Sequence, residues 1–195
     1  MKLLRIVWSI VVLTLGLVVF YLFWPRAVEL PKIGTVNEWP FTEVNRKEAS
    51  HQDKPKLVTF FFTNCPDVCP MTFIELKELQ GVMQEKGIAD DEYIIVAVTL
   101  DPVFDTEERI RQYAENMGIL NPNWLFLRGT EEDTKQFTQS FHFTYTKNAE
   151  GFVTHSTTMY IVDPQDRIRS QHTMAVGTRR VNIEEIADQL EQFIK

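Results

Sequence analysis

The sequence predicts an α/β domain with a mixed central sheet between layers of helices, preceded by one membrane-spanning helix. Two crossovers of the order strand, helix, strand come first in the globular part, and a hairpin and an amphipathic helix follow them. This order places helices on both faces of a sheet and gives a three-layer sandwich. The chain has 195 residues, of which 44% are apolar, so it is long enough for one globular domain with an appendage.

The appendage is an apolar segment at the N-terminus, residues 3–24, in which Arg5 is the only charged residue. About 20 apolar residues are enough to cross a hydrocarbon core of roughly 30 Å as a helix. A signal peptide has an apolar region of about 7–15 residues followed by small residues, whereas FWPR (23–26) follows here. No cysteine lies near this segment, which argues against a lipoprotein anchor. We therefore expect residues 1–24 to form an uncleaved transmembrane anchor.

Basic residues on the two sides of this span predict its orientation. Lys2, Arg5 and the amino terminus precede it, while Arg26 and Lys32 follow it, which favours an N-terminus in the cytoplasm. We therefore expect a single-pass protein of the cell membrane whose globular domain lies on the extracytoplasmic side.

Composition and charge divide the rest of the chain into a tether and an acidic domain. Three prolines and one glycine among residues 25–40 are typical of a tether, which leaves residues 41–195 for the globular domain. Beyond Arg26 the chain has 27 acidic against 17 basic residues and no basic cluster. This balance argues against nucleic acid as a partner.

The first half of the domain contains the two crossovers. The short runs KLVTFFFT (56–63) and EYIIVAVTL (92–100) are rich in aromatic and β-branched residues and predict buried strands. Between them, apolar residues three and four apart predict a helix from Pro70 to about Lys86. A second helix is predicted over residues 106–117, because a threonine suited to an N-cap and two glutamates begin it and a glycine follows its end.

The second half contains the hairpin. A brief apolar run at 124–127 predicts another strand, and residues 131–141 predict another helix. Residues 153–162 and 168–176 predict two strands joined by a turn, and residues 182–194 predict a closing amphipathic helix. The order of elements is thioredoxin-like.

The two cysteines of the chain lie in FFFTNCPDVCPMT (60–72), separated by three residues. They can form a disulfide, a redox couple or part of a metal site, but a bridge closing so short a loop offers little entropic stabilisation. Cys65 follows a predicted strand, at the sheet edge where α/β proteins place their chemistry. Pro70 fits the first turn of a helix, so we expect the helix to begin there with Cys69 at its cap. The helix dipole should then lower the pKa of both thiols.

A metal site needs a ligand besides two thiolates, and the four histidines are the candidates. His155, in VTHST (153–157), is predicted to lie early in a strand near the cysteine end of the sheet. By pattern alone, a ligand and a structural role both remain open for it. His51 in a polar loop, His142 between two aromatic residues and His172 on the polar phase of the last strand are expected to be structural or solvated.

Three blocks of sequence, taken together, resemble the ordered motifs of the Sco/SenC family. They are FTNCPDVCP (62–70), TLDP (99–102) followed by DT (105–106), and VTHS (153–156) followed by YIVDP (160–164). The resemblance extends from about residue 40 to the C-terminus. It implies a membrane-anchored, thioredoxin-like copper protein that takes part in assembling the copper A centre of cytochrome c oxidase.

The resemblance also implies roles for single residues. Cys65, Cys69 and His155 would be the copper ligands, and Asp101 would lie near them and tune the site without being a ligand. The sequence departs from the family pattern at two positions. The family often has Asp where Thr154 stands and Gly where Asp166 stands, and these differences affect the hydrogen bonding around the ligands and the geometry of the hairpin turn.

Three functions from different classes follow from these residues. Two thiolates and an imidazole suit Cu(I) and can hold Cu(II), whereas a structural zinc site normally has four strong protein ligands. The leading hypothesis is therefore a copper metallochaperone that delivers copper to the copper A centre of cytochrome c oxidase. The alternative is a thiol-disulfide oxidoreductase that reduces the oxidase's copper-binding cysteines, which needs Cys65 and Cys69 but not His155. A purely structural receptor module needs neither cysteine.

Overall fold

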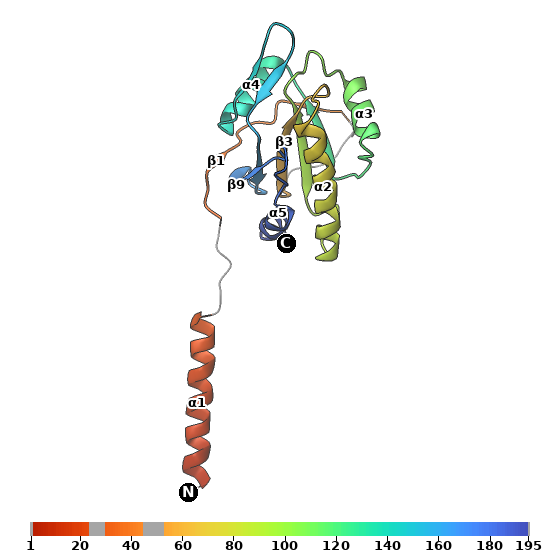
Figure 1. Ribbon diagram of the computed structural model, residues 1–195. Coiled ribbons are helices and arrows are strands. Elements are labelled where there is room, and N and C mark those ends of the chain that lie inside the picture. The colour runs from red at the N-terminus through yellow and green to blue at the C-terminus, as the bar shows by residue number, and fades with distance from the viewer. Residues whose placement is uncertain (1, 24–29, 45–52, 195) are drawn as a thin grey trace.

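The computed structural model describes residues 2–23, 30–44 and 53–194, and its elements are labelled in Figure 1. The helix α1, Lys2–Phe23, coincides with the predicted membrane segment. Its stretch Leu4–Tyr21 is long and apolar enough to cross a bilayer, a test that a signal sequence near an N-terminus also passes.

The domain has a central sheet of seven strands, with the spatial order β1-β9-β8-β3-β4-β5-β2. Its strands are β1 Gly34–Thr35, β2 Thr42–Glu43, β3 Lys56–Phe61, β4 Ile94–Thr99, β5 Trp124–Arg128, β8 Thr158–Val162 and β9 Arg167–Thr173. The strands β3, β4 and β5 are parallel, and the other neighbours pair antiparallel, so the sheet is mixed as predicted. The remaining strands, β6 Tyr145–Lys147 and β7 Val153–His155, form a separate two-stranded sheet.

Helices cover both faces of the central sheet, because successive side chains of a strand point to opposite sides. Phe60 of β3 packs against Phe137, with ring centroids 6.2 Å apart. Its neighbour Phe61 packs against Phe73 and Tyr113, at 5.6 Å and 5.8 Å. Phe137 belongs to α4, Phe73 to α2 and Tyr113 to α3, so α4 lies on one side and α2 and α3 on the other (Figure 1).

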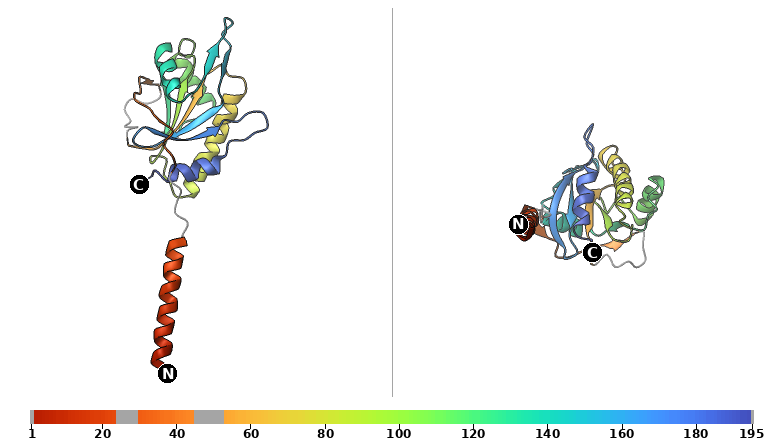
Figure 2. Two further views of the ribbon diagram at one scale, coloured as in Figure 1. Left: turned by 90° about the vertical axis from the view of Figure 1, so that its left-hand side faces the viewer. Right: turned by 90° about the horizontal axis from the view of Figure 1, so that it is seen from below.

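The helices of the domain are α2 Val68–Glu85, α3 Glu107–Asn116, α4 Glu131–Ser140 and α5 Ile183–Glu191. The closing helix α5 packs beside α2 on the same face of the sheet (Figure 2). Together these layers confirm the predicted three-layer α/β sandwich.

Several predicted helix ends are confirmed at the level of single residues. The Thr106 side chain accepts a hydrogen bond from the Arg109 backbone N–H and caps α3, and Gly118 beyond that helix has a φ of 63°. Asn182 caps α5 through the Glu185 backbone N–H. These are the roles that short polar side chains and glycine fill at helix termini.

The start of α2 differs from the prediction by two residues. The helix begins at Val68 with Asp67 at the N-cap position, so Cys69 lies inside the first turn rather than at the cap. Pro70 does not mark the first helical residue, because the first N–H groups of a helix have no intrahelical partner and a proline is tolerated throughout the first turn.

The strand predicted over residues 153–162 is wrong as a single element. The chain forms β7 and β8 instead, and it passes from the two-stranded sheet to the central sheet between them, at Ser156 and Thr157. The Ser156 backbone N–H donates to the Thr144 carbonyl at 2.8 Å, and this bond closes the hairpin of β6 and β7. The strand β6 was not predicted, because it is short and mostly exposed.

Part of the segment predicted as a tether lies in the sheet. Gly34 and Thr35 pair with Ile168 and Arg167 at the outer edge of β9. At the turn before β9, Asp166 has a φ of 57°, a left-handed conformation that glycine adopts more easily. Its carboxylate binds the buried Lys56 ammonium at 3.1 Å, an interaction that a glycine could not make.

We predict that Asp163→Ala lowers the free energy of unfolding by about 3 kcal/mol. The buried Asp163 carboxylate accepts hydrogen bonds from the Arg167 backbone and side chain, from Gln165 and from Arg169. The change can be measured by urea unfolding of the detergent-solubilised chain. As a control, Asp91→Ala alters an exposed aspartate and should shift stability by less than about 0.5 kcal/mol.

The same carboxylate predicts a pH dependence. Burial alone would raise the pKa of Asp163, but the hydrogen bonds from Arg167 and Gln165 hold it below its usual value. Its contribution to stability is therefore complete above the pKa of an unfolded aspartate and is lost as the pH falls through the lowered pKa. A stability difference between the wild type and Asp163→Ala that widened in acid would contradict this assignment.

Candidate metal centre

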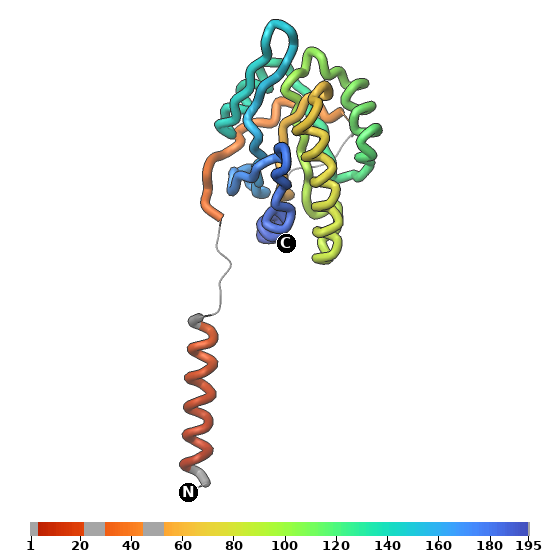
Figure 3. The backbone as a smooth tube through the Cα atoms, in the orientation of Figure 1, coloured from red at the N-terminus to blue at the C-terminus, as the bar shows by residue number. Residues whose placement is uncertain are grey.

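The sulfur atoms of Cys65 and Cys69 and a ring nitrogen of His155 lie within 4.8 Å of one another. Cys65 lies in the turn between β3 and α2, Cys69 in the first turn of α2, and His155 is the last residue of β7. The three segments gather at one end of the domain, where Figure 3 shows the hairpin of β6 and β7 beside the start of α2. The structure thus brings together the three residues singled out in the sequence.

The start of α2 positions both sulfurs. The Cys69 backbone N–H donates to the Cys65 sulfur at 3.4 Å, as an N–H in the first turn can do because it has no carbonyl partner within the helix. Cys65 is half-buried and Cys69 is buried, and both are free thiols. One sulfur of the pair is therefore open to a reactant or a partner, and the other is covered.

The two sulfurs have opposite acid-base behaviour. A hydrogen bond from the Cys69 thiol outweighs the effect of burial and, with a contact from His155, lowers the pKa of Cys65 to about 4. The same hydrogen bond, together with burial, raises the pKa of Cys69 well above its usual value. At neutral pH the pair is a Cys65 thiolate held by a Cys69 thiol. A thiolate is the form that binds soft metal ions and attacks disulfides.

The His155 ring is held from two sides. Its Nδ1 atom lies 2.7 Å from the Ser156 carbonyl oxygen, which can only accept, so Nδ1 donates this hydrogen bond. Phe143 stacks on the ring at 6.0 Å between centroids, and Phe62 meets it edge-on at 5.9 Å. A ring held through a hydrogen bond from one nitrogen is the arrangement that metal-binding histidines adopt, because the other nitrogen can then bind the ion.

Asp101 contacts the hairpin of β6 and β7 through an ion pair. Its buried carboxylate accepts from the Lys147 ammonium at 2.7 Å and from the Phe104 backbone N–H at 3.3 Å. Lys147 belongs to β6, so the ion pair joins the loop after β4 to the hairpin that carries His155. An influence of Asp101 on the ligands stays a prediction from the family resemblance.

Asp105 lies in one of the sequence motifs given above, but the sequence alone assigned no role to it. Its fully buried carboxylate accepts hydrogen bonds from the backbone N–H and the hydroxyl of Thr63 and from the hydroxyl of Thr99. It therefore holds the chain two residues before Cys65, and its charge contributes to the raised pKa of Cys69. The signal in the sequence was an acidic residue soon after a buried strand, directly before a helix cap.

The two other histidines that the structure describes do not join the cluster. His142 is exposed with a φ of 52°, and His172 is buried, where its Nε2 atom lies 3.0 Å from Gln189 and 3.2 Å from Ser170. His142 is therefore solvated and His172 structural, but the prediction that His172 lies on the polar phase of its strand is wrong, because it belongs to the buried face of β9. His51 lies outside the described residues.

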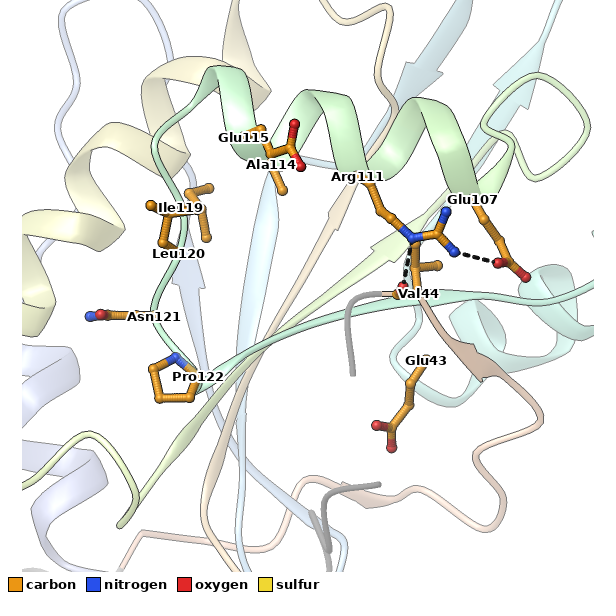
Figure 4. Close-up of a pocket in the computed structure, with 10 residues that line it drawn as sticks. All are labelled: Glu43, Val44, Glu107, Arg111, Ala114, Glu115, Ile119, Leu120, Asn121 and Pro122. Carbon is orange, nitrogen blue, oxygen red and sulfur yellow. Dashed lines mark hydrogen bonds and ion pairs between the residues drawn. The ribbon is translucent and has the colours of Figure 1, made fainter. Parts of the chain in front are cut away.

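A cavity of about 750 Å³ lies away from the cysteines, between α3, the loop after it and β2 (Figure 4). Arg111 crosses it and donates to the Val44 carbonyl and to Glu107. None of the three candidate ligands lines this cavity, so it is separate from the metal centre.

A family model described as SCO1/SenC matches residues 38–195, a span that contains all three candidate ligands. The chain belongs to the SCO1/SenC family. The resemblance carried by the cysteine and histidine motifs is thereby confirmed.

One relative and two solved structures are similar to the chain. The SCO2-like protein RP587 of Rickettsia prowazekii is 26% identical over 131 residues, which cover 64% of this chain and 61% of the relative. The chain thus spans less than two thirds of that protein.

The two structures confirm the fold. BsSco, described as a member of the Sco family of cytochrome c oxidase assembly proteins with a disulfide switch, has a TM-score of 0.70 at 22% identity and covers 86% of this chain and 97% of its own. The copper-bound ScoI of Bradyrhizobium japonicum has a TM-score of 0.62 at 25% identity and covers 79% of this chain and 96% of its own.

We predict that Cys65 of the reduced chain is alkylated by iodoacetamide readily at pH 6, with a rate that falls only as the pH approaches about 4. Cys69→Ala removes the hydrogen-bond donor, so the pKa of Cys65 should rise and the rate at pH 6 should fall at least about tenfold. Mass spectrometry of the modified chain measures both rates.

The Cys65→Ser chain is the control for this measurement, because its remaining thiol, Cys69, should react slowly. A pH profile that is the same in the wild type and in Cys69→Ala would show that the hydrogen bond between the two sulfurs does not set the reactivity of Cys65.

Proposed function

We propose that the chain binds one copper ion through Cys65, Cys69 and His155 and delivers it to the copper A centre of cytochrome c oxidase. The observation that carries this proposal is the meeting of two sulfurs and one imidazole nitrogen within 4.8 Å. Two soft sulfur ligands and one imidazole suit Cu(I), and the same set can hold Cu(II). The copper-bound relative and the family's place in oxidase assembly support copper as the cargo and the oxidase as its acceptor.

The acid-base state of the sulfurs suits loading and release of the ion. The Cys65 thiolate is already deprotonated when the ion arrives, and binding releases the proton of the Cys69 thiol. Three protein ligands leave room for an acceptor's ligand to join the ion before a ligand of this chain departs. Transfer can then proceed by exchange of one ligand at a time at the half-buried Cys65.

The apolar helix α1 supports action at a membrane surface. Its side chains between Leu4 and Tyr21 are exposed in the structure, as expected for a helix that lies in lipid. The basic residues before the span favour a cytoplasmic N-terminus. In this arrangement α1 anchors the chain in the cell membrane, and the metal-binding domain works on the extracytoplasmic side.

The low pKa of the half-buried Cys65 favours thiol-disulfide exchange as a second candidate function. The Cys65 thiolate would attack a disulfide of the oxidase's copper site and form a mixed disulfide. Cys69, after losing its proton, would then displace the second thiol, which leaves two reduced cysteines on the oxidase and a disulfide between Cys65 and Cys69. That disulfide removes both sulfur ligands, so the redox state of the pair would decide whether copper can bind.

We predict that His155→Ala weakens binding of Cu(I) by at least about 100-fold, because losing a ligand costs at least as much as losing a partner that orients one. The affinity is measured on the reduced, detergent-solubilised chain by competition with a chromogenic Cu(I) chelator. His142→Asn, which alters an exposed histidine and tolerates its positive φ, should bind like the wild type. An unchanged affinity for Cu(I) in His155→Ala would contradict the three-ligand site.

A comparison in cells separates the two functions. If the chain is a copper chaperone, His155→Ala and Cys65→Ser should both lower the copper content and the activity of the oxidase. If the chain is a thiol reductase, only Cys65→Ser should lower the copper content and the activity of the oxidase. If neither substitution changes the oxidase, both functions are excluded in favour of a structural role.

A further inference from the structure

The histidine of the metal centre lies on a different sheet from the cysteines. Cys65 and Cys69 follow β3 of the central sheet, whereas His155 ends β7 of the two-stranded sheet. The distance between the imidazole and the sulfurs therefore depends on how the hairpin of β6 and β7 sits against the rest of the domain. A pair of strands of three residues each has little stability of its own and must be held by its surroundings.

One face of this hairpin carries both His155 and Lys147. In the antiparallel register, Tyr145 lies opposite His155 and Lys147 lies opposite Val153. Side chains of directly opposed residues point to the same face, and residues two apart on a strand share that face. Lys147 therefore lies on the ligand face, about 7 Å along the strand from the position opposite His155. Thr154 lies on the other face and is exposed.

The ion pair between Lys147 and Asp101 ties this face to the domain. The Lys147 ammonium lies 2.7 Å from Asp101, and the exposed fractions of the two side chains are 33% and 7%. Among the described residues, the other hydrogen bonds and ion pairs of residues 145–155 stay within the hairpin and its flanks, apart from the contact of His155 with Cys65 itself. Directly opposite Lys147, next to the turn of the hairpin, the Val153 side chain is buried and adds an apolar contact.

We propose that Lys147 is a positioning residue of the metal centre, because its ion pair with Asp101 holds the hairpin where His155 faces the two sulfurs. This inference rests on the proposed three-ligand copper site. It assigns to Asp101 a mechanical part, through Lys147, in the arrangement of the ligands. The loop after β4 and the hairpin lie at the same end of the domain (Figure 3), and the salt bridge joins them there.

Electrostatics and positioning predict opposite effects for the loss of Lys147. Removing a positive charge near a site with a thiolate favours a cation, so the charge effect alone would tighten copper binding. Releasing the hairpin moves the imidazole and would weaken binding. A fall in affinity therefore isolates the positioning effect from the direct effect of charge.

The first test is the Cu(I) affinity of Lys147→Met, measured on the reduced full-length chain in detergent with the chelator competition described above. Loss of a residue that orients a metal ligand typically costs about 10-fold to 100-fold in affinity, and we expect a loss of this size. Lys147→Arg keeps an ion pair with Asp101 and should retain the affinity of the wild type. Lys135→Met, which removes an exposed lysine of α4, should have no effect.

The second test places Lys147→Met in the His155→Ala background. If Lys147 acts through His155, the substitution causes no further loss of affinity in a chain that has no imidazole to position. An equal loss in both backgrounds, or unchanged affinity in the single variant, overturns the proposal. If His155→Ala binds copper like the wild type, the proposed three-ligand site is wrong. This outcome is visible in His155→Ala alone, so it is distinguished from a failure of the proposal for Lys147.

A third measurement needs no copper. In the metal-free chain, amide hydrogen exchange of the hairpin should be faster in Lys147→Met than in the wild type, while the amides of β3 and β4 keep their protection. Exchange of the hairpin that is the same in both chains would show that the ion pair does not hold it. Faster exchange across the whole domain would show general destabilisation and would equally overturn the positioning role.

Discussion

The metal centre depends on the hydrogen bonds that the buried Asp105 carboxylate accepts from Thr63 and Thr99. These bonds tie the end of β3 to the end of β4, which are neighbouring parallel strands. The short turn from Thr63 to the start of α2 then has little freedom, and it brings the Cys65 sulfur against Cys69 in the first turn of that helix. A carboxylate buried to this degree is costly unless its oxygens are bonded, so the same bonds that stabilise Asp105 also position the cysteines.

The contact between the sulfurs connects metal binding with thiol chemistry. The Cys69 thiol stabilises the Cys65 thiolate, and the thiolate in turn keeps the proton on Cys69. In the proposed copper site, a soft metal ion would replace that shared proton and bind both sulfurs. An oxidant removes the proton together with two electrons and forms a disulfide. Copper and an oxidant therefore act on the same pair of atoms, and each product prevents the other.

The parts of the fold that depend on local sequence were predictable, and those that depend on distant contacts were not. The apolar runs of β3 and β4 and the periodicity of α2 predicted the crossovers, because burial of such runs dictates their structure. The spacing of the two cysteines is likewise a local feature of the sequence, and it predicted where the site lies. By contrast, VTHSTTMYIV (153–162) has the composition of one strand, and its break follows from a bond between Ser156 and Thr144. Nothing near Ser156 in the sequence specifies that partner.

The roles of Asp105 and Lys147 escaped prediction for the same physical reason. Asp105 is separated from Thr63 by 42 residues, and Lys147 is separated from Asp101 by 46. A charged side chain in a sequence is usually solvated, so only the folded structure reveals that these two are paired in the interior or at its edge.

The two halves of the site differ in how firmly the structure holds them. Cys65 follows a strand whose residues are all buried, and Cys69 lies in the first turn of a helix packed on the central sheet, so moving either sulfur would disturb the core. The imidazole lies on a small hairpin that the ion pair of Lys147 with Asp101 and the buried Val153 side chain hold beside its turn. A perturbation of the domain therefore displaces His155 before it displaces either sulfur. In the proposed transfer of an ion to an acceptor, His155 is therefore the ligand that can move away with the least disturbance of the fold.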